Sequence, residues 1–336
     1  MRKLLSLVVA VLVIGVALVV AWPHLRGGSG PTVTTTSTTV HHSPVAPLSG
    51  LADPSGVSLT RPALSIKIEN TPEALPQWGV DQADVVYEEI VNGGITRLLA
   101  IFNSHAPSKV GPVRSVRPTD TQILWPLGGI FAYSGGAAYA IASISTVPSL
   151  KLIDESSAGA AMFRDPTRYA PHNLYAVAPS LFAFPAKPTP PPPLFTYRQG
   201  ALTLASSVVK SFVVPFPSIY PVTWTWDTTT LSWDRTLFAS PDVTGTNVRE
   251  SPKNVIVMWV NYVNGIGTMS SYADLQGSGP AAIFTDGREV HAQWSRGPLK
   301  SDVVQYRTAS GARVALSPGQ TWVELLNTGA LLSVTK

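Results

Sequence analysis

Residues 84–118 read DVVYEEIVNGGITRLLAIFNSHAPSKVGPVRSVRP, and this stretch decides how the rest of the chain can fold. Residues 85–90 alternate between two faces and are rich in β-branched and aromatic side chains, which predicts a strand. Residues 92–94, Asn-Gly-Gly, tolerate the positive φ angles of a tight turn. Residues 95–102 again have strand character. The stretch therefore predicts a β-hairpin followed by an extended segment that carries arginines.

The return strand of this hairpin, residues 95–102, is largely apolar on both faces and contains Arg97. A strand of this kind lies inside a sheet whose two faces are both covered. A buried guanidinium needs a carboxylate or an anionic ligand, because an unpaired buried charge is costly. Glu89 or Glu88, across the turn, is the expected partner. Since these two acids are adjacent on a strand, they face opposite sides of it and cannot form a catalytic pair with each other.

The composition excludes several classes of protein. The chain has 336 residues and no cysteine, which excludes a disulfide framework, a thiol nucleophile and a Cys-ligated metal. The net charge is +4 with only 13% charged residues, too few for the clustered basic face of a nucleic-acid-binding protein. No P-loop, His-Glu-x-x-His or Gly-x-Ser-x-Gly motif occurs. We therefore expect no metal, no cofactor and no nucleic-acid partner.

The first 60 residues predict a membrane anchor and a tether. The segment from Leu4 to Trp22 is almost entirely apolar, follows Arg2-Lys3, and is about as long as a bilayer core is thick. A cleaved signal peptide is the alternative, although no clean A-x-A site follows. We expect residues 1–26 to form a single-pass transmembrane or signal anchor, with the globular part outside the cytoplasm. Residues 27–60 are rich in Ser, Thr, Gly and Pro, which predicts a flexible tether.

Beyond residue 60 the sequence predicts an α+β fold of two domains. Residues 61–186 mix strand-like and short helical segments, as expected for an N-terminal mixed α/β domain. The proline-rich segment 187–194 is stiff and predicts a linker. Residues 195–336 read as a small β-rich domain, a sandwich or a barrel, with a hairpin turn at 286–287. Its strand candidates are residues 220–226, 254–263, 281–285, 290–294 and 321–326.

Short motifs in both predicted domains resemble the YerB family, bacterial envelope proteins built from two DUF3048 domains. In the first domain the motifs include QADVVYE (82–88), GGITR (93–97), GPVRSVR (111–117) and PHNLY (171–175). In the second they include NVIV (254–257), GSG (277–279), DG (286–287) and PGQTW (318–322). The resemblance implies an exported, membrane-attached, two-domain α+β protein. It implies no established activity.

Two features depart from the family pattern. Members of the family are often lipoproteins with a cysteine anchor, whereas this chain has no cysteine, which fits a transmembrane anchor instead. The residue before Gly93-Gly94 is commonly Glu in relatives and is Asn92 here. This second departure weakens any mechanism that needs an acid at the turn.

Three arginines and a polar loop are the main candidates for a functional site. Arginine suits recognition of an anion, because its planar fork makes bidentate bonds to phosphate or carboxylate. We expect these side chains to bind an anionic component of the cell envelope, such as a teichoic-acid-like polymer, a lipid head group or a stem carboxylate of peptidoglycan. The candidate ligand-binding residues are Glu89, Arg97, Arg114, Arg117, Asp120, His172 and Asn173. The simpler alternative is that the arginines pair internally with Glu88, Glu89, Asp84 and Asp120.

Two further functions fit the sequence. A hydrolase or lyase acting on the cell wall needs acid–base groups, which Glu89 with Asp120, or His172 with either acid, can supply. A structural or partner-binding protein would use the C-terminal domain as its contact surface. An exposed aromatic row there would indicate a glycan or protein platform, whereas core packing is the expected role of its tryptophans. These are Trp224, Trp226, Trp233, Trp259, Trp294 and Trp322.

Overall fold

The structure is a computed structural model, and it describes residues 43–217 and 221–336. The expected anchor from Leu4 to Trp22, and the tether as far as residue 42, lie outside the described residues. Within the two described ranges, no helix is both long enough and apolar enough to cross a bilayer.

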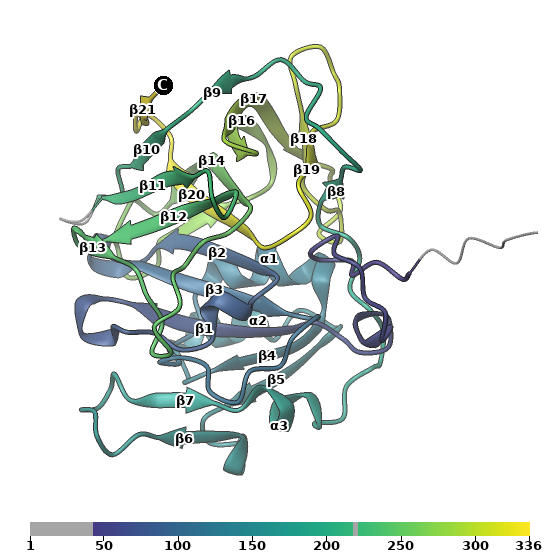
Figure 1. Cartoon of the computed structure of the whole chain (residues 1–336). Helices are drawn as coiled ribbons and strands as arrows, with labels where there is room; N and C mark the ends of the chain where they lie inside the picture. Colours follow the sequence, from purple (N-terminus) through teal and green to yellow (C-terminus); the bar gives the residue numbers. More distant parts are fainter. Residues whose placement is uncertain (1–42, 218–220) are drawn as a thin grey trace, which may run out of the picture. The chain divides into compact units, whose positions relative to one another are not determined.

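One long sheet runs through both halves of the chain, in the order β18-β17-β16-β14-β20-β2-β3-β1-β4-β5 (Figure 1). The first half supplies β1 (Leu64–Asn70), β2 (Val85–Ile90), β3 (Thr96–Phe102), β4 (Gly129–Tyr133) and β5 (Leu150–Asp154). The second half supplies β14 (Asn254–Val263), β16 (Gly277–Thr285), β17 (Arg288–Arg296), β18 (Gln305–Arg307) and β20 (Thr321–Asn327). The halves join where β2 and β20 pair in parallel, with Val85 opposite Thr321.

Shorter strands and three α-helices complete the described structure. A five-stranded sheet contains β10 (Ser211–Val214), β11 (Val222–Asp227), β12 (Ser232–Leu237), β13 (Ser240–Pro241) and β21 (Ser333–Thr335). Two small pairs join β6 (Met162–Arg164) with β7 (Leu174–Ala176), and β8 (Thr196–Tyr197) with β19 (Ala315–Leu316). Two strands extend the long sheet, β9 (Ser207–Val208) beside β17 and β15 (Tyr272–Asp274) beside β14. The α-helices are α1 (Pro118–Leu127), α2 (Ala138–Ile144) and α3 (Ala178–Phe182).

The predicted hairpin forms as expected and lies inside the long sheet. β2 and β3 pair in antiparallel register, and Gly93 and Gly94 take φ angles of 79° and 74° in the turn between them. All residues of β3 are buried, because β1 and β2 flank it and both of its faces are covered. The predicted hairpin turn at 286–287 also forms, and it joins β16 to β17.

The two faces of the long sheet are covered differently. On the side that we call the helix face, Leu99 and Ile101 of β3 pack in one core with Leu124 of α1 and Ile144 of α2. On the opposite side, the small-sheet face, Leu98 of β3 belongs to the core that contains side chains of the five-stranded sheet. These include Phe212, Trp224 and Trp233. Successive residues of each central strand therefore contribute to different cores.

The C-terminal half is β-rich as predicted, but it does not form a separate sandwich or barrel. Its long strands instead continue the sheet of the N-terminal half, and its five-stranded sheet packs over the small-sheet face (Figure 1). Alternation along residues 254–263 and 321–326 predicts strands, but it does not specify which strand each one pairs with. The pairing between β2 and β20 joins segments that are far apart in the sequence.

The flexible tether does not extend to residue 60 as expected. Ala46 and Leu48 are buried, and the hydroxyl of Tyr197 donates a hydrogen bond to the Leu48 carbonyl. The amide of Gly319 donates to the Ser49 carbonyl at 2.7 Å. The high Ser, Thr and Pro content of this segment predicted a tether, but the segment also contains a few apolar residues that pack against the C-terminal half.

Candidate functional site

Strand periodicity brings three charged side chains into one row on the helix face. Glu69 of β1, Arg97 of β3 and Glu89 of β2 are directly opposite one another in the sheet register. Lys67 lies two residues before Glu69 and therefore faces the same side. The first turn of α1 places Asp120 against Lys67.

Lys67 holds two carboxylates in the interior. Its ammonium group contacts the Glu89 carboxylate and lies 2.7 Å from Oδ1 of Asp120, and all three side chains are buried. The other oxygen of Asp120 accepts the backbone N–H of Arg117 at 2.7 Å. Burial raises the pKa of Asp120 to about 6, with a further contribution from Glu89, although Lys67 opposes the shift.

The predicted arginines lie together beside this group. Nη1 of Arg97 and Nη1 of Arg117 both donate to the Ser115 carbonyl, at 3.1 Å and 3.4 Å. Nη2 of Arg117 donates to Oδ1 of Asn92 at 2.7 Å, so the hairpin turn also helps to place it. Nε of Arg114 lies 3.3 Å from Oε1 of Glu69. We call Lys67, Glu69, Glu89, Arg97, Arg114, Arg117, Asp120 and His172 the arginine cluster.

The arginine cluster carries more positive charge than its acids neutralise. Lys67 and the three arginines provide four cations, against the three carboxylates of Glu69, Glu89 and Asp120. Nε of Arg97 and Nε of Arg117 are buried and have no hydrogen-bond acceptor among the described residues, whereas Nε of Arg114 faces the carboxylate of Glu69. Burial, and then the charges of Arg117 and Arg114, lower the pKa of Arg97 to about 9. Arg97 is only 6% exposed and still carries its charge at neutral pH.

The expected ion pair between Arg97 and Glu88 or Glu89 does not form. No carboxylate of the described chain lies within ion-pair distance of Arg97, because Glu89 pairs with Lys67 and Glu88 faces the other side. Lys67 and Glu69 were not among the predicted site residues. A detectable signal was present in residues 64–70, LSIKIEN, where Ser65, Lys67 and Glu69 alternate with apolar residues.

The histidine joins the arginine cluster through Glu69. Nδ1 of His172 lies 3.0 Å from Oε2 of Glu69, while Arg114 contacts the other oxygen of the same carboxylate. A cavity of about 410 Å³ opens at His172, and Arg168 and Tyr169 also line it. His172 therefore connects the buried charges to accessible space.

Asn173 lies next to His172 in sequence but has a different role. Its Oδ1 accepts a hydrogen bond from Arg164 at 2.7 Å, and its Nδ2 donates to the carbonyls of Asp165 and Arg168. These bonds fix the loop between β6 and β7. Both ends of its side-chain amide are thus occupied inside the loop, and none of these bonds involves Arg97, Arg114 or Arg117.

The proposed acid–base residues do not assemble as a group. His172 contacts Glu69, whereas Glu89 and Asp120 are both held by Lys67 with almost no exposed surface. This arrangement gives His172 no direct contact with either acid. Among the residues described, no group of His, Asp and Glu side chains can hold a metal ion.

A second charged cluster lies on the small-sheet face, directly behind the first. Arg235 of β12 is fully buried, lies 2.7 Å from Oε2 of Glu88, and also pairs with Asp242. Glu324 of β20 accepts the indole N–H of Trp224 at 2.9 Å. Burial, and then Glu88, raise the pKa of Glu324 well above its usual value. We call Glu88, Arg235, Asp242 and Glu324 the Arg235 cluster.

Most tryptophans of the C-terminal half have the predicted core role. Trp224, Trp233, Trp294 and Trp322 are buried. Trp226 and Trp259 are partly buried and pack against the core of the small-sheet face. These six side chains therefore do not form an exposed aromatic row.

Comparison with known proteins identifies the family. Residues 48–187 match the domain described as "Protein of unknown function (DUF3048) N-terminal domain", and residues 212–323 match its C-terminal counterpart. The protein named "Putative lipoprotein YerB" from Bacillus subtilis (strain 168) is 26% identical over 302 residues, which cover 87% of this chain and 88% of that protein. The crystal structure of YerB from Bacillus subtilis has the same fold, with a TM-score of 0.75 at 22% identity over 88% of this chain and all of that one. The chain therefore belongs to the DUF3048 family and contains both its N-terminal and its C-terminal domain.

Proposed function

We propose that this protein binds an anionic group of a cell-envelope component through the arginine cluster. The observation that carries the proposal is the uncompensated positive charge around Arg97, together with the buried Nε donors of Arg97 and Arg117, which lack an acceptor. A phosphate or carboxylate offers several acceptor oxygens and a negative charge in one compact group. Such a ligand would satisfy these donors by charge-assisted hydrogen bonds.

Ligand access is supported by the outer members of the cluster. The side chain of Arg114 is 19% exposed and that of His172 is 26% exposed, and the cavity of about 410 Å³ opens at the histidine. Arg114 and His172 share the carboxylate of Glu69, which keeps both groups close to the entrance. An anion in this cavity would lie beside His172, which contacts the same Glu69 carboxylate as Arg114.

We place this activity outside the cytoplasm, on a membrane-attached protein. Two observations support this location: a relative bears the name of a lipoprotein, and the sequence from Leu4 to Trp22 has the length and polarity of a membrane anchor. The chemistry of the ligand is therefore restricted to phosphate or carboxylate groups that are present in the envelope.

The proposal is tested with the full-length chain in a polyoxyethylene detergent, which carries neither charge nor sugar. Calorimetry would compare poly(glycerol phosphate), phosphatidylglycerol vesicles and a peptidoglycan stem peptide, so that polymer, lipid and carboxylate sources are distinguished. We expect one of them to bind, and Arg117→Gln to weaken that binding about tenfold or more. Arg313→Gln removes the same charge at an exposed position and serves as the matched control.

Two results would contradict the proposal. In the first, none of the three ligands binds the wild-type chain. In the second, a ligand binds Arg114→Ala, Arg117→Gln and wild type equally well. The second result would assign the arginines to the structural role, in which they fix the loops around Ser115.

A further inference from the structure

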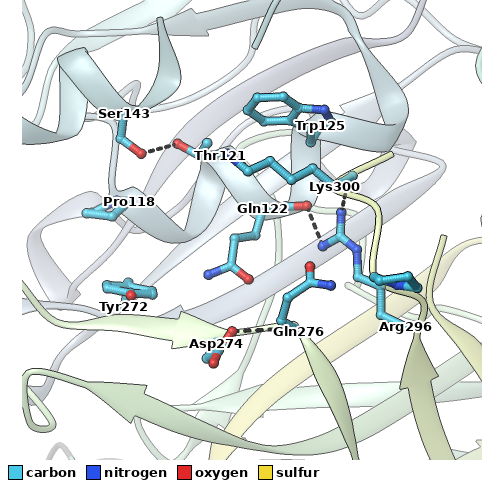
Figure 2. Close-up of a pocket in the computed structure, with 11 residues that line it drawn as sticks. Pro118, Thr121, Gln122, Trp125, Ser143, Tyr272, Asp274, Gln276, Arg296 and Lys300 are labelled. Atoms are coloured by element: carbon cyan, nitrogen blue, oxygen red, sulfur yellow. Dashed lines mark hydrogen bonds between the residues drawn. The ribbon is translucent and has the colours of Figure 1, made fainter. Parts of the chain in front are cut away.

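A cavity outside the arginine cluster lies between α1 and the ends of β15 and β17. It has a volume of about 440 Å³, within the roughly 300–1,000 Å³ that is typical of small-molecule sites. Trp125 of α1 and Tyr272 of β15 line it from opposite ends, as Figure 2 shows. α1 belongs to the first half of the chain and both strands to the second, so the cavity lies where the two family domains meet.

The walls of this cavity are held in place by hydrogen bonds. Oε1 of Gln122 accepts the amide of Leu275 at 2.8 Å, and the hydroxyl of Thr119 accepts the amide of Ala273 at 3.0 Å, which fixes α1 against β15. Arg296 is buried at the end of β17 and donates from Nη1 to the Gln122 carbonyl at 2.8 Å. It also donates to the carbonyls of Asp302 and Lys300, so the loop after β17 is fixed as well (Figure 2).

Several polar groups on residues that line the cavity have no hydrogen-bond partner among the described residues. They are the hydroxyl of Tyr272, Oδ2 of Asp274 and Oε1 of Gln276; Oδ1 of Asp274 and Nε2 of Gln276 are already used. The ammonium group of Lys300 has no carboxylate partner and lies 4.4 Å from the centre of the Trp125 ring. A cation–π contact of an exposed lysine contributes only about 0.5–1 kcal/mol, so Lys300 can move aside for a ligand.

This combination favours a ligand that is apolar on its flat faces and polar around its edge. A simple hydrocarbon would leave the Asp274 carboxylate and the Tyr272 hydroxyl without hydrogen bonds, which is costly. A free anion is disfavoured because it would meet Asp274, and because the donors of Arg296 are occupied by backbone carbonyls. A sugar ring meets both requirements, with C–H groups that stack on an aromatic ring and hydroxyls that accept and donate at its rim.

We propose that this cavity binds a pyranose residue of a glycan chain. One face of the sugar ring stacks on Trp125, and its hydroxyls bond to Asp274, Tyr272 and Lys300. The loop that carries Lys300 and the partly exposed rings leave the cavity open to solvent, so the glycan can continue beyond the bound residue. The site shares none of its residues with the arginine cluster, and the inference does not depend on the function proposed above.

The test measures glycan binding by the full-length chain in the same polyoxyethylene detergent. The probes are the tetramer of β-1,4-linked N-acetylglucosamine and the tetramer of β-1,4-linked glucose, which distinguish an acetylated glycan from a plain one. Saturation-transfer NMR and calorimetry report the contact surface and the affinity. We expect one tetramer to bind, and Trp125→Ala to weaken that binding about tenfold or more. Asp274→Asn should weaken it about fivefold.

Control variants distinguish glycan binding in this cavity from binding at the His172 cavity or at the arginine cluster. Tyr169→Ala removes an aromatic ring that is 91% exposed at the other cavity, and we expect it to change glycan affinity less than about twofold. Arg117→Gln should likewise leave glycan binding unchanged, so failure of the anion proposal and failure of this one give different results. If Trp125→Ala does not fold, as judged by circular dichroism, Asp274→Asn and Tyr272→Phe provide the same test.

The inference is overturned if neither tetramer binds at concentrations up to about 10 mM, a limit that corresponds to less than about 3 kcal/mol of binding free energy. It is also overturned if Trp125→Ala and Asp274→Asn both bind as tightly as wild type. Loss of glycan binding in Tyr169→Ala alone would place the sugar beside His172 and not in this cavity.

Discussion

The arginine cluster and the Arg235 cluster lie back to back on the same sheet and handle buried charge differently. Adjacent residues of β2 separate them, since Glu89 faces α1 and Glu88 faces the five-stranded sheet. In the Arg235 cluster one guanidinium is shared by Glu88 and Asp242, and acids are in excess. In the arginine cluster cations are in excess, and the Nε donors of Arg97 and Arg117 lack acceptors.

The sign of the excess charge is the reason why we propose an anionic ligand for the arginine cluster and not for the Arg235 cluster. A buried carboxyl group can take up a proton, and the raised pKa of Glu324 shows that its environment favours this solution. A guanidinium cannot lose its proton as readily, because even the lowered pKa of Arg97 is about 9. The Arg235 cluster can therefore reduce its excess charge by taking up a proton, whereas the arginine cluster cannot readily shed a proton, and we propose that an anion balances its charge.

The largest expected effect comes from removing the only guanidinium that the Arg235 cluster contains. Arg235→Met leaves Glu88 and Asp242 buried without a counter-charge, so we expect the free energy of unfolding to fall by about 3–5 kcal/mol. Urea denaturation followed by circular dichroism measures this change. A loss below about 1 kcal/mol would show that Glu88 and Asp242 do not depend on Arg235 for charge compensation. The difference between the two clusters would then disappear.

The pH dependence of stability provides a second test, on the arginine cluster. The pKa of Asp120 is about 6 in the folded chain against an ordinary value of 3.8, so the folded state holds a proton that the unfolded state has lost. The raised pKa of Asp120 stabilises the folded state fully below about pH 4. This stabilisation, at most about 3 kcal/mol, is lost as the pH rises to about 6. Asp120→Asn should abolish this decline. Parallel pH profiles of wild type and variant would refute the assignment.

Glu324 gives a smaller effect that sharpens the comparison on the other face. If Glu324 is neutral, glutamine can replace it, because the amide oxygen still accepts the indole N–H of Trp224. We expect Glu324→Gln to change the free energy of unfolding at pH 7 by less than about 1 kcal/mol. At higher pH the wild type loses stability because the buried Glu324 is forced to ionise, and the variant should not show this loss. A loss comparable to that of Arg235→Met would instead indicate an ionised Glu324.

The smallest stability change is expected at Arg97, which has no carboxylate partner. Arg97→Gln should alter the free energy of unfolding by less than about 1 kcal/mol, because no ion pair is broken. The same variant should abolish any rise in melting temperature that phosphate causes in the wild type, since a ligand of the folded state stabilises it. Potassium chloride at matched ionic strength is the control. If phosphate stabilises both proteins equally, the excess charge at Arg97 has no role in binding.

Sequence periodicity predicted local structure well in this chain. The hairpin of residues 85–102, the hairpin turn at 286–287 and the strand at 254–263 all form. Each of them is specified by neighbouring residues, through alternation or Gly turns. The continuous sheet was missed because its central contact joins β2 to β20, and no local pattern encodes that pairing.

The candidate site was predicted in part for the same reason. Arg97, Arg114 and Arg117 are close in sequence, and the structure places them together around Ser115. The partners of the acids were not predictable from the hairpin alone, because Lys67 comes from β1 and Arg235 from the other half of the chain. Because Glu88 and Glu89 are adjacent on a strand, the sequence did indicate that their carboxylates lie on opposite faces of the sheet.

The pairing of β2 with β20 also constrains how the chain can be assembled. Val85 pairs with Thr321, so a strand made early waits for a neighbour that is synthesised 236 residues later. Until β20 arrives, one edge of β2 offers unpaired amides and carbonyls to any other extended segment. Folding of the first half must therefore be slow to finish or protected from misassociation, and a fragment that stops before residue 321 should aggregate, however well its own hairpin forms.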